Sequence, residues 1–244
     1  MGEIQPMLCA VCNSHDLIPF ARKAEWSFLK CANCAFVFLD PMPSQTTLNT
    51  LYVDDRGITR AHYPKAGSRY SRALRRALRL LPYLYRKRAL DLGCGGGFMT
   101  NAMRLCGAQA SGLDVNAAAI AYARRRFAHC TFHCASFDDF AVGEPYDFIY
   151  SSEMIEHLSD LGSYQRLLRS LSRLGTYVYL TTPDLGSRNV PANFTEWDVC
   201  TPPHHVQFFN EDNLRRWMQQ AGFEQCQRLS DRKAGLKVIF RRVA

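Results

Sequence analysis

Short apolar runs recur from residue 89 to the end of the sequence, separated by longer amphipathic stretches. Residues 89–92, 146–150 and 177–182 are such runs, and "ASGLD" is another, ending at Asp114. Runs of this length that contain branched and aromatic residues are typical of buried strands. Strands that alternate with helices predict βαβ units and therefore a parallel sheet.

The stretches between and after these runs predict the helices. Apolar residues at helical spacing predict one helix through 158–174 and another, "LRRWMQQAGF", that ends near Gly222. The final runs, 224–230 and 236–243, follow each other closely and predict an antiparallel hairpin at the end of the sheet.

Ahead of residue 89 the pattern is different. Pro41 and Pro43 mark a linker, and Ser44 is suited to cap a helix that carries Leu48, Leu51 and Tyr52. A second helix is predicted to end or kink at Pro82. One of its faces is apolar and the other is basic: Tyr70, Leu74, Leu78 and Leu81 against Arg72, Arg75, Arg76 and Arg79.

Charge separates the same two parts of the chain. The net charge is +8, and residues 1–88 hold 14 Lys and Arg against 6 Asp and Glu. The arginine-rich helix could contact nucleic acid or acidic lipid. Few aromatic residues lie among the arginines, so stacking on bases is not indicated. We therefore favour a solvated face on a helix that packs against the main domain.

Length and composition are those of an ordinary globular protein. The chain has 244 residues, of which 47% are hydrophobic and 21% charged. It has no apolar run of about 18 residues, so no membrane span is expected. Its start, "MGEIQPML", lacks the basic and apolar regions of a secretory leader, and Pro6 breaks the myristoylation pattern. The expected location is the cytoplasm.

Four of the ten cysteines form two C-x2-C pairs, Cys9 with Cys12 and Cys31 with Cys34, separated by 18 residues. Four thiolates suit a tetrahedral zinc ion without an open position, and the stretch between the pairs is long enough for a β-hairpin. A redox site would need only one pair. Residues 1–40 therefore predict a ribbon that binds one structural zinc ion, which would supply its folding free energy.

A glycine-rich loop follows the first buried strand of the main domain. Its sequence "LDLGCGGGF" has Phe98 where the dinucleotide fingerprint needs Gly or Ala, and it has no lysine for a Walker A loop. Asp91 points a carboxylate toward this loop, which favours a cation over a pyrophosphate. Asp114 ends the next strand, where a carboxylate can accept hydrogen bonds from ribose. The pattern indicates a positively charged nucleoside ligand without phosphate.

At this point the sequence resembles the class I S-adenosylmethionine (SAM)-dependent methyltransferases. The resemblance covers residues 89–244 and rests on five motifs in the right order: "LDLGCGGG", "GLDVN", "FHCASFDDF", "YDFIYSSEMIEHL" and "YVYLTTPD". The cysteine ribbon followed by "DPMPS" and "LNTLY" resembles a bacterial subset that acts on small molecules. The resemblance implies an α/β fold, a Rossmann-like seven-stranded methyltransferase sheet with an N-terminal zinc ribbon.

The resemblance also implies a set of cofactor-binding residues. Asp91 and the loop 93–97 would hold the methionine end, Asp114 the ribose, and Val115 the adenine. Ser136 and Phe137 would border the adenine. The full set implied for SAM is Asp91, Gly93, Cys94, Gly95, Gly97, Asp114, Val115, Ser136, Phe137 and Ser152.

Histidines are the candidate catalytic residues, because transfer to a hydroxyl requires a base. The segment "TPPHHVQFF" resembles a P-P-x-H motif of the same subset, and it makes His205 the first candidate and His204 the second. A hydrogen bond from His205 to a loop carbonyl is the alternative. His157 is the third candidate, and it would share a helix start with Glu153. A structural role under the floor of the active site is the alternative. Phe194 and Trp197 could wall an acceptor pocket or simply pack the loop.

The sequence thus predicts three segments: a zinc ribbon at 1–40, a linker with a basic amphipathic helix at 41–88, and a methyltransferase domain at 89–244. The leading hypothesis is methylation of a small-molecule acceptor, such as a hydroxyl of a sugar, a glycan precursor or a natural product. An RNA methyltransferase that uses the basic N-terminal region is the alternative. A SAM-binding protein without activity is disfavoured, because both carboxylates are present.

Overall fold

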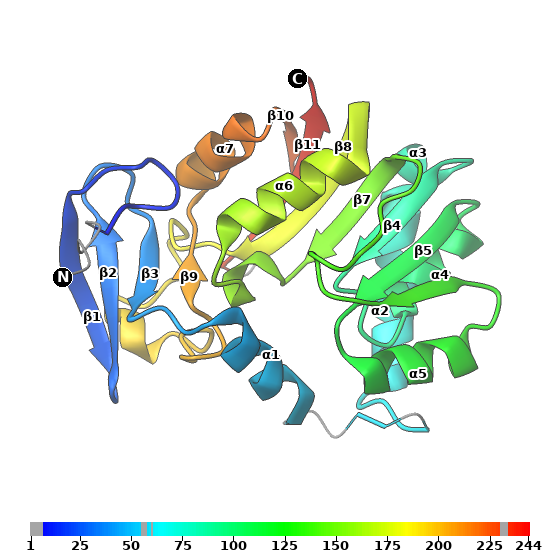
Figure 1. The fold of residues 1–244 in the computed structure, drawn as a ribbon, viewed down its shortest axis with the longest axis horizontal. Coiled ribbons are helices and arrows are strands. Elements are labelled where there is room, and N and C mark those ends of the chain that lie inside the picture. Colours follow the sequence, from blue (N-terminus) through cyan, green and yellow to red (C-terminus); the bar gives the residue numbers. More distant parts are fainter. Residues whose placement is uncertain (1–6, 55–57, 60, 230–233) are drawn as a thin grey trace.

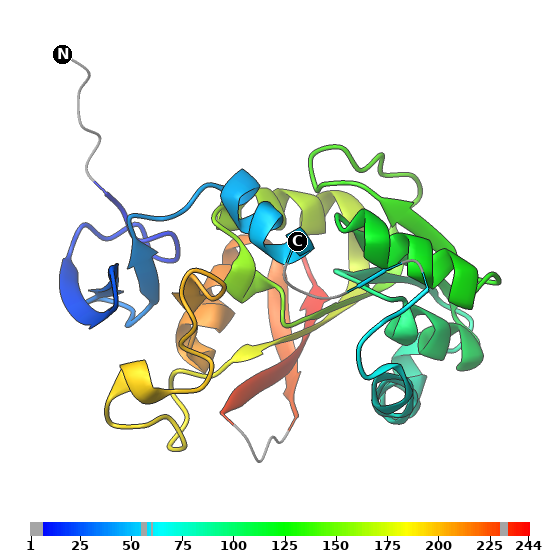
Figure 2. The same cartoon turned by 90° about the horizontal axis from the view of Figure 1, so that it is seen from below.

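Two β-sheets organise the chain: the larger extends from the middle of the molecule to one end, and the smaller lies at the other end (Figures 1 and 2). The computed structural model describes residues 7–54, 58–59, 61–229 and 234–244. The larger sheet has seven strands in the order β10-β11-β8-β7-β4-β5-β6. The smaller has four, in the order β1-β2-β3-β9. This confirms the predicted fold class.

The seven-stranded sheet is parallel except at one edge. Its strands are β4 (Arg88–Leu92), β5 (Gln109–Asp114), β6 (Thr131–Cys134), β7 (Tyr146–Ser152), β8 (Ser172–Pro183), β10 (Phe223–Arg228) and β11 (Gly235–Arg242). The last two strands form the predicted antiparallel hairpin, and β11 pairs antiparallel with β8. The carboxyl ends of β4, β5 and β7 therefore share one edge.

Helices cover both faces of this sheet (Figure 1). They are α4 (Phe98–Leu105), α5 (Ala117–Arg126), α6 (Leu161–Leu171) and α7 (Glu211–Gln220). Neighbouring residues of a strand point to opposite faces, as the period of two requires. Leu90 packs in the cluster that contains α6 and α7, whereas Ala89 packs against α2 and α4. The helix predicted to end near Gly222 is confirmed as α7.

The predicted helix through 158–174 is shorter than expected. Asp160 caps α6 by accepting hydrogen bonds from the amides of Gly162 (2.8 Å) and Ser163 (3.1 Å), so the helix starts at Leu161. It ends at Leu171 because β8 begins at the next residue. Glu153 and His157 do not share an α-helix: a short 3-10 helix spans Ile155–His157, and Glu153 has a left-handed backbone, with φ 53°.

The small sheet belongs to the N-terminal ribbon but is completed by a distant strand. β1 (Leu17–Lys23) and β2 (Trp26–Cys31) form the predicted hairpin, followed by β3 (Val37–Asp40). β9 (Gln207–Phe208) pairs with β3 and comes from the segment between β8 and α7. The sheet of the ribbon predicted at residues 1–40 therefore includes one strand from the 89–244 segment.

Both helices predicted ahead of residue 89 are present, but the basic helix packs with a different face than predicted. α1 (Gln45–Asp54) begins after Ser44, whose hydroxyl accepts from the Thr47 amide at 3.2 Å, as expected. α2 (Ala66–Arg79) and α3 (Leu81–Leu84) follow, and α2 ends before Pro82. The predicted apolar face is wrong at its end, because Leu78 and Leu81 are 56% and 40% exposed. The smaller Ala77 is buried instead and lets α2 approach α4 closely.

Two expectations fall outside the described residues. The leader argument rests largely on residues 1–6, and the side chain of Tyr52 is likewise not described. Within the described residues, no helix has the length and apolar character needed to cross a bilayer.

Candidate active site and metal centre

The glycine loop places backbone, rather than side chains, at the carboxyl end of β4. Gly93 has φ +77°, and a Cβ on it would lie 2.9 Å from the sulfur of Met154. Gly97 has φ +75°, and a Cβ there would lie 2.6 Å from the Phe132 ring. Both positions therefore require glycine, since a side chain would be strained and would clash. The loop that results leaves room for a ligand above β4.

Asp91 lies under this loop with its carboxylate fixed. It is 2% exposed, and one oxygen accepts hydrogen bonds from the amide (2.9 Å) and the hydroxyl (2.7 Å) of Thr100 at the start of α4. Burial raises the pKa of the Asp91 carboxyl from its ordinary value to about 7. A cation beside this carboxylate would favour its ionised form.

Asp114 orients the next part of the site. Its two oxygens accept from the amides of Gly95 at 2.7 Å and Asn116 at 2.8 Å. The Asn116 side chain in turn caps α5 by accepting from the Ala119 amide at 2.9 Å. The carboxylate is thereby held between the glycine loop and the start of α5, where it faces the cavity.

A single cavity of about 1360 Å³ joins these residues. It exceeds the roughly 300–1000 Å³ of a typical ligand pocket, so a cofactor and an acceptor can occupy it together. Nine residues of the implied cofactor set line it: Asp91, Gly93, Cys94, Gly95, Asp114, Val115, Ser136, Phe137 and Ser152. Gly97 instead serves the packing of α4 on Phe132. The Ser136 hydroxyl is engaged locally, donating to Asp139 at 2.6 Å.

Arg76 lines the cavity, whereas the sequence analysis placed it only on the basic face of a helix. Its guanidinium donates to the Tyr150 hydroxyl and to the Ser152 hydroxyl (3.1 Å) at the end of β7. Ser152 in turn shares a hydrogen bond of 2.7 Å with Thr181. Arg69, Arg72 and Arg79 of the same helix also line the cavity. The basic side of α2 thus faces the cavity rather than only solvent, which corrects the sequence interpretation.

The candidate catalytic histidines meet at one side of the cavity. His157 lines it, and its Nδ1 lies 2.6 Å from the carbonyl of His204. The Nδ1 of His205 lies 2.6 Å from the carbonyl of Val199, the loop contact foreseen as the alternative, and its ring contacts that of His157 with centroids 4.6 Å apart. Because a carbonyl only accepts, both Nδ1 atoms carry hydrogen in these contacts, and Nε2 is the basic nitrogen of each neutral ring.

Glu156 lies beside His157, with its Oε1 4.0 Å from Nε2 of the histidine. It is fully buried, with Oε2 accepting from the Thr182 hydroxyl at 3.0 Å and Oε1 without a hydrogen-bond partner. Burial raises the pKa of the Glu156 carboxyl well above its usual range. One ligand atom from each of Glu156, His157 and His205 lies within 4.8 Å of the others, so these side chains can share a proton or hold a cation.

The segment between β8 and α7 also contributes to the cavity lining, and residues 195–206 of it are called the acceptor loop below. Trp197, Asp198 and Val199 line the cavity. Phe194 packs instead between Phe28 and Phe208 of the small sheet, at centroid distances of 5.3 and 4.9 Å. Trp197 belongs to the same buried cluster as Phe194 but also lines the cavity, whereas Phe194 does not line it.

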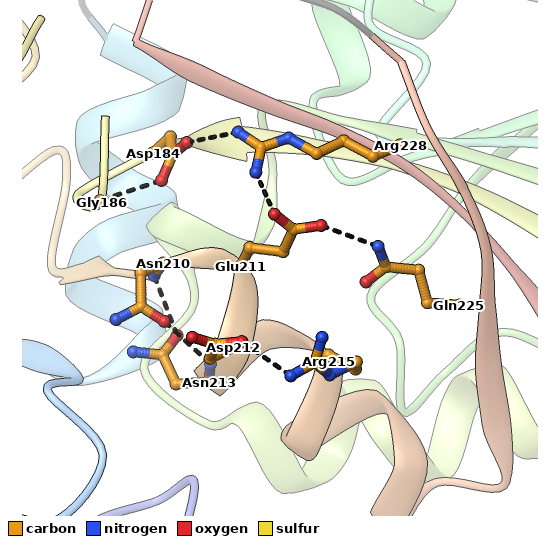
Figure 3. A network of polar contacts seen from close by, with 9 residues as sticks. All are labelled: Asp184, Gly186, Asn210, Glu211, Asp212, Asn213, Arg215, Gln225 and Arg228. Atoms are coloured by element: carbon orange, nitrogen blue, oxygen red, sulfur yellow. Dashed lines mark hydrogen bonds and ion pairs between the residues drawn. The ribbon is translucent and has the colours of Figure 1, made fainter. Parts of the chain in front are cut away.

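A polar network joins the two ends of the segment between β8 and α7 (Figure 3). The Arg228 guanidinium on β10 contacts Asp184 at 3.0 Å and also Glu211 at the start of α7. Asn210 and Asn213 form a capping box at the same helix start. The two ends of the segment are thus fixed on the main sheet. Its middle contacts both the main domain, where the Val206 amide donates to the Glu156 carbonyl at 2.8 Å, and the ribbon.

The four N-terminal cysteines converge as predicted. The sulfur atoms of Cys9 and Cys34 lie 3.6 Å apart, those of Cys12 and Cys31 lie 3.5 Å apart, and all four are within 4.8 Å of one another. Four sulfurs about 2.3 Å from one zinc ion would be about 3.8 Å apart, so the donor set fits a tetrahedral site. None of the four is part of a disulfide, and Cys9 and Cys31 are fully buried.

Comparison with known proteins shows the family to which the chain belongs. The sequence profile of a family described as "Methyltransferase domain" matches residues 65–227, well over half of the chain. The fold and the motif order define the class I SAM-dependent methyltransferases. The chain belongs to this methyltransferase family.

Individual relatives cover only part of this chain. It is 31% identical over 159 residues to a ubiquinone biosynthesis O-methyltransferase of Aromatoleum aromaticum, spanning 59% of this chain and 66% of that protein. A protein of the same name from Bordetella pertussis is 31% identical over 102 residues, which is 39% of this chain and 42% of that protein. The matches thus span less than two thirds of these relatives.

Solved structures share the fold. Magnesium protoporphyrin IX methyltransferase from Synechocystis PCC 6803, solved with bound SAH (S-adenosylhomocysteine), superposes with a TM-score of 0.57 at 13% identity, covering 81% of this chain and 99% of that one. A SAM-dependent methyltransferase from Mesorhizobium loti gives 0.55 at 21% identity, covering 72% and 99%.

Proposed function

We propose that this protein transfers the methyl group of SAM to a hydroxyl of a small-molecule acceptor. The observation that carries the proposal is the one cavity that joins Asp91, Asp114 and His157. The relatives named as O-methyltransferases support oxygen as the acceptor atom and ubiquinone precursors as the first compounds to assay. They give no support to a sugar or glycan acceptor.

The implied cofactor set fits SAM. The buried Asp91 and the glycine loop suit the methionine end, Asp114 suits the ribose hydroxyls, and Val115 offers an apolar contact that is 41% exposed. Arg76, hydrogen-bonded to Ser152 at the end of β7, suits the methionine carboxylate. When bound, SAM supplies an electrophilic methyl group.

The protein's own part is to hold the acceptor hydroxyl and to remove its proton. His157 is the residue best placed for this, because it lines the cavity and its ring is fixed by the His204 carbonyl. His205 does not line the cavity but contacts the His157 ring. We assign the base role to His157 and an orienting role to His205, the reverse of their order in the sequence analysis.

The four-cysteine centre completes the proposal as a structural zinc site without a part in the chemistry. The division into segments 1–40, 41–88 and 89–244 remains our proposed domain organisation. The cytoplasmic location also remains a prediction from the sequence.

Asp91 is expected to make SAM binding depend on pH. In the free protein its carboxyl, with a pKa raised to about 7, keeps its proton in part of the molecules near neutral pH. A cationic ligand favours the ionised form, so binding releases a proton and affinity rises from about pH 6 to about pH 8. Titration calorimetry measures this, and Asp91→Asn should lose the dependence. An unchanged pH profile in the variant would remove Asp91 from the cofactor site.

The Asp91 carboxyl should also make the stability of the free protein depend on pH. Stability should fall as pH rises, whereas SAM affinity should rise. Between about pH 4 and pH 7 the folded state holds a proton that the unfolded chain has lost, so this group's contribution to stability falls as pH rises. Thermal unfolding of wild type and Asp91→Asn across that range gives an independent check.

The proposal is tested by two experiments on the full chain. Calorimetry with SAH should show binding, and label from methyl-labelled SAM should appear on a phenolic ubiquinone precursor but not on a structured RNA. RNA binding that persists at physiological salt, together with labelled RNA, would establish the alternative instead. Absence of SAH binding would refute both.

A further inference from the structure

One lysine of the ribbon reaches across to the acceptor loop. Lys23 is the last residue of β1, and its ammonium donates to the carbonyls of Thr195 (2.8 Å) and Cys200 (2.7 Å). These acceptors lie more than 170 residues away in the sequence. Charge-assisted hydrogen bonds of this kind are the stronger class, and the side chain is half-buried.

The two carbonyls mark the ends of the segment that walls the cavity. Trp197, Asp198 and Val199, the three loop residues that line the cavity, lie between Thr195 and Cys200. Lys23 therefore holds the backbone at both ends of the three residues that line the cavity. These two hydrogen bonds are called the Lys23 clamp below. Because its partners are carbonyl groups, this contact fixes the position of the backbone independently of the side chains that the segment carries.

Val199 and His205 connect the segment that Lys23 holds to the proposed base, His157. Within the clamped segment, Val199 presents its carbonyl to Nδ1 of His205, and the His205 ring contacts the His157 ring. Other contacts between ribbon and loop run in parallel. The Leu39 amide donates to the Val206 carbonyl at 2.8 Å.

We propose that Lys23 is a positioning residue for the acceptor side of the active site, and that through it the zinc ribbon forms part of the acceptor site. The inference rests on the proposed methyl transfer. It predicts that the ribbon affects acceptor turnover and leaves cofactor binding unchanged, because Lys23 contacts the acceptor loop and none of the implied cofactor residues.

The test compares three variants of the full chain. Lys23→Met removes the donors and keeps an apolar stem of similar length, whereas Lys23→Arg keeps donors at this position. Arg22→Met is the matched control, because Arg22 is an exposed neighbour whose guanidinium bonds the nearby Ala24 carbonyl at 3.3 Å. Zinc content and SAH affinity should be the same in all three.

Hydrogen exchange measures how strongly the Lys23 clamp protects the backbone of the acceptor loop, and it needs no acceptor molecule. In Lys23→Met, amides in peptides covering 195–205 should exchange about tenfold faster or more, since opening the segment no longer breaks two charge-assisted bonds. Peptides covering 89–114 should not change. Arg22→Met should match wild type throughout, and Lys23→Arg should recover most of the protection. Unchanged exchange at 195–205 in Lys23→Met overturns the clamp.

Kinetics then test its role. With a phenolic precursor methylated by the wild type, Lys23→Met should lower kcat/KM by about tenfold, mainly through KM for the acceptor, as expected when uniform binding is lost. Equal kcat/KM in Lys23→Met and Arg22→Met overturns the positioning role even if exchange has changed. Failure of the wild type to bind SAH would refute the proposed function and leave the exchange result to decide on the clamp.

Discussion

Replacing His157 with alanine is expected to lower kcat for methyl transfer by about 10²–10⁴-fold, the usual contribution of a positioned base. The Kd for SAH should stay at the wild-type value, because Asp91 and Asp114 hold the other side of the cavity. The reason is geometric: His157 lines the cavity, and the His204 carbonyl fixes its ring with Nε2 as the basic nitrogen. Single-turnover kinetics at saturating SAM give the rate directly.

Two further variants make this result specific. His205→Ala should cost less than His157→Ala, since His205 acts through the ring contact of 4.6 Å. His129→Ala is the control, because His129 is exposed and does not line this cavity. A loss of less than tenfold in His157→Ala would assign the histidine a structural role only. A larger loss in His205→Ala than in His157→Ala would restore His205 as the base.

Cys31→Ser is expected to abolish zinc binding and unfold the ribbon. Cys31 is fully buried, and the four sulfurs are close enough for one ion. Structural zinc sites of this kind contribute about 10–16 kcal/mol, far more than a small sheet can replace by burying apolar surface. Metal analysis should find about one zinc per chain in the wild type and none in the variant, and proteases should then cleave within residues 7–40.

Cys226→Ser is the matched control, because Cys226 is an exposed thiol on β10. It should keep both zinc and protease resistance. Absence of zinc from the wild type purified without chelators would contradict the metal assignment. If the ribbon also positions the acceptor loop, Cys31→Ser should lose methyl transfer while it retains SAH binding.

Much of the fold was predictable because its signals are local. The run 89–92 and the glycines after it specify a strand and a turn within a dozen residues, and the structure has β4 and the loop there. The pairs Cys9–Cys12 and Cys31–Cys34 likewise need only their spacing to indicate a shared ion. Asp91 and Asp114 follow from their places at the carboxyl ends of β4 and β5, which lie side by side in a parallel sheet.

The basic helix shows where such reasoning fails. Periodicity ranked Leu78 as buried because leucine is larger and more apolar than its neighbour Ala77. In the structure the close approach of α2 to α4 requires the small residue at the interface, so Ala77 is buried and Leu78 is exposed. The same rotation turns Arg76 toward Tyr150 and into the cavity. Which arginine of a basic face becomes functional depends on a packing angle that the helix sequence does not encode.

The sequence by itself determined the family, the glycine loop after β4 and the grouping of four cysteines, because each is specified by residues close together in the chain. The tertiary structure alone decided which histidine lines the cavity, and it alone brought Lys23 to Thr195 and Cys200. It also decided that a two-residue strand, β9, would complete the ribbon sheet. These contacts join segments far apart in the sequence, and two residues are too few to show any period, so only the folded chain defines the acceptor side of the site.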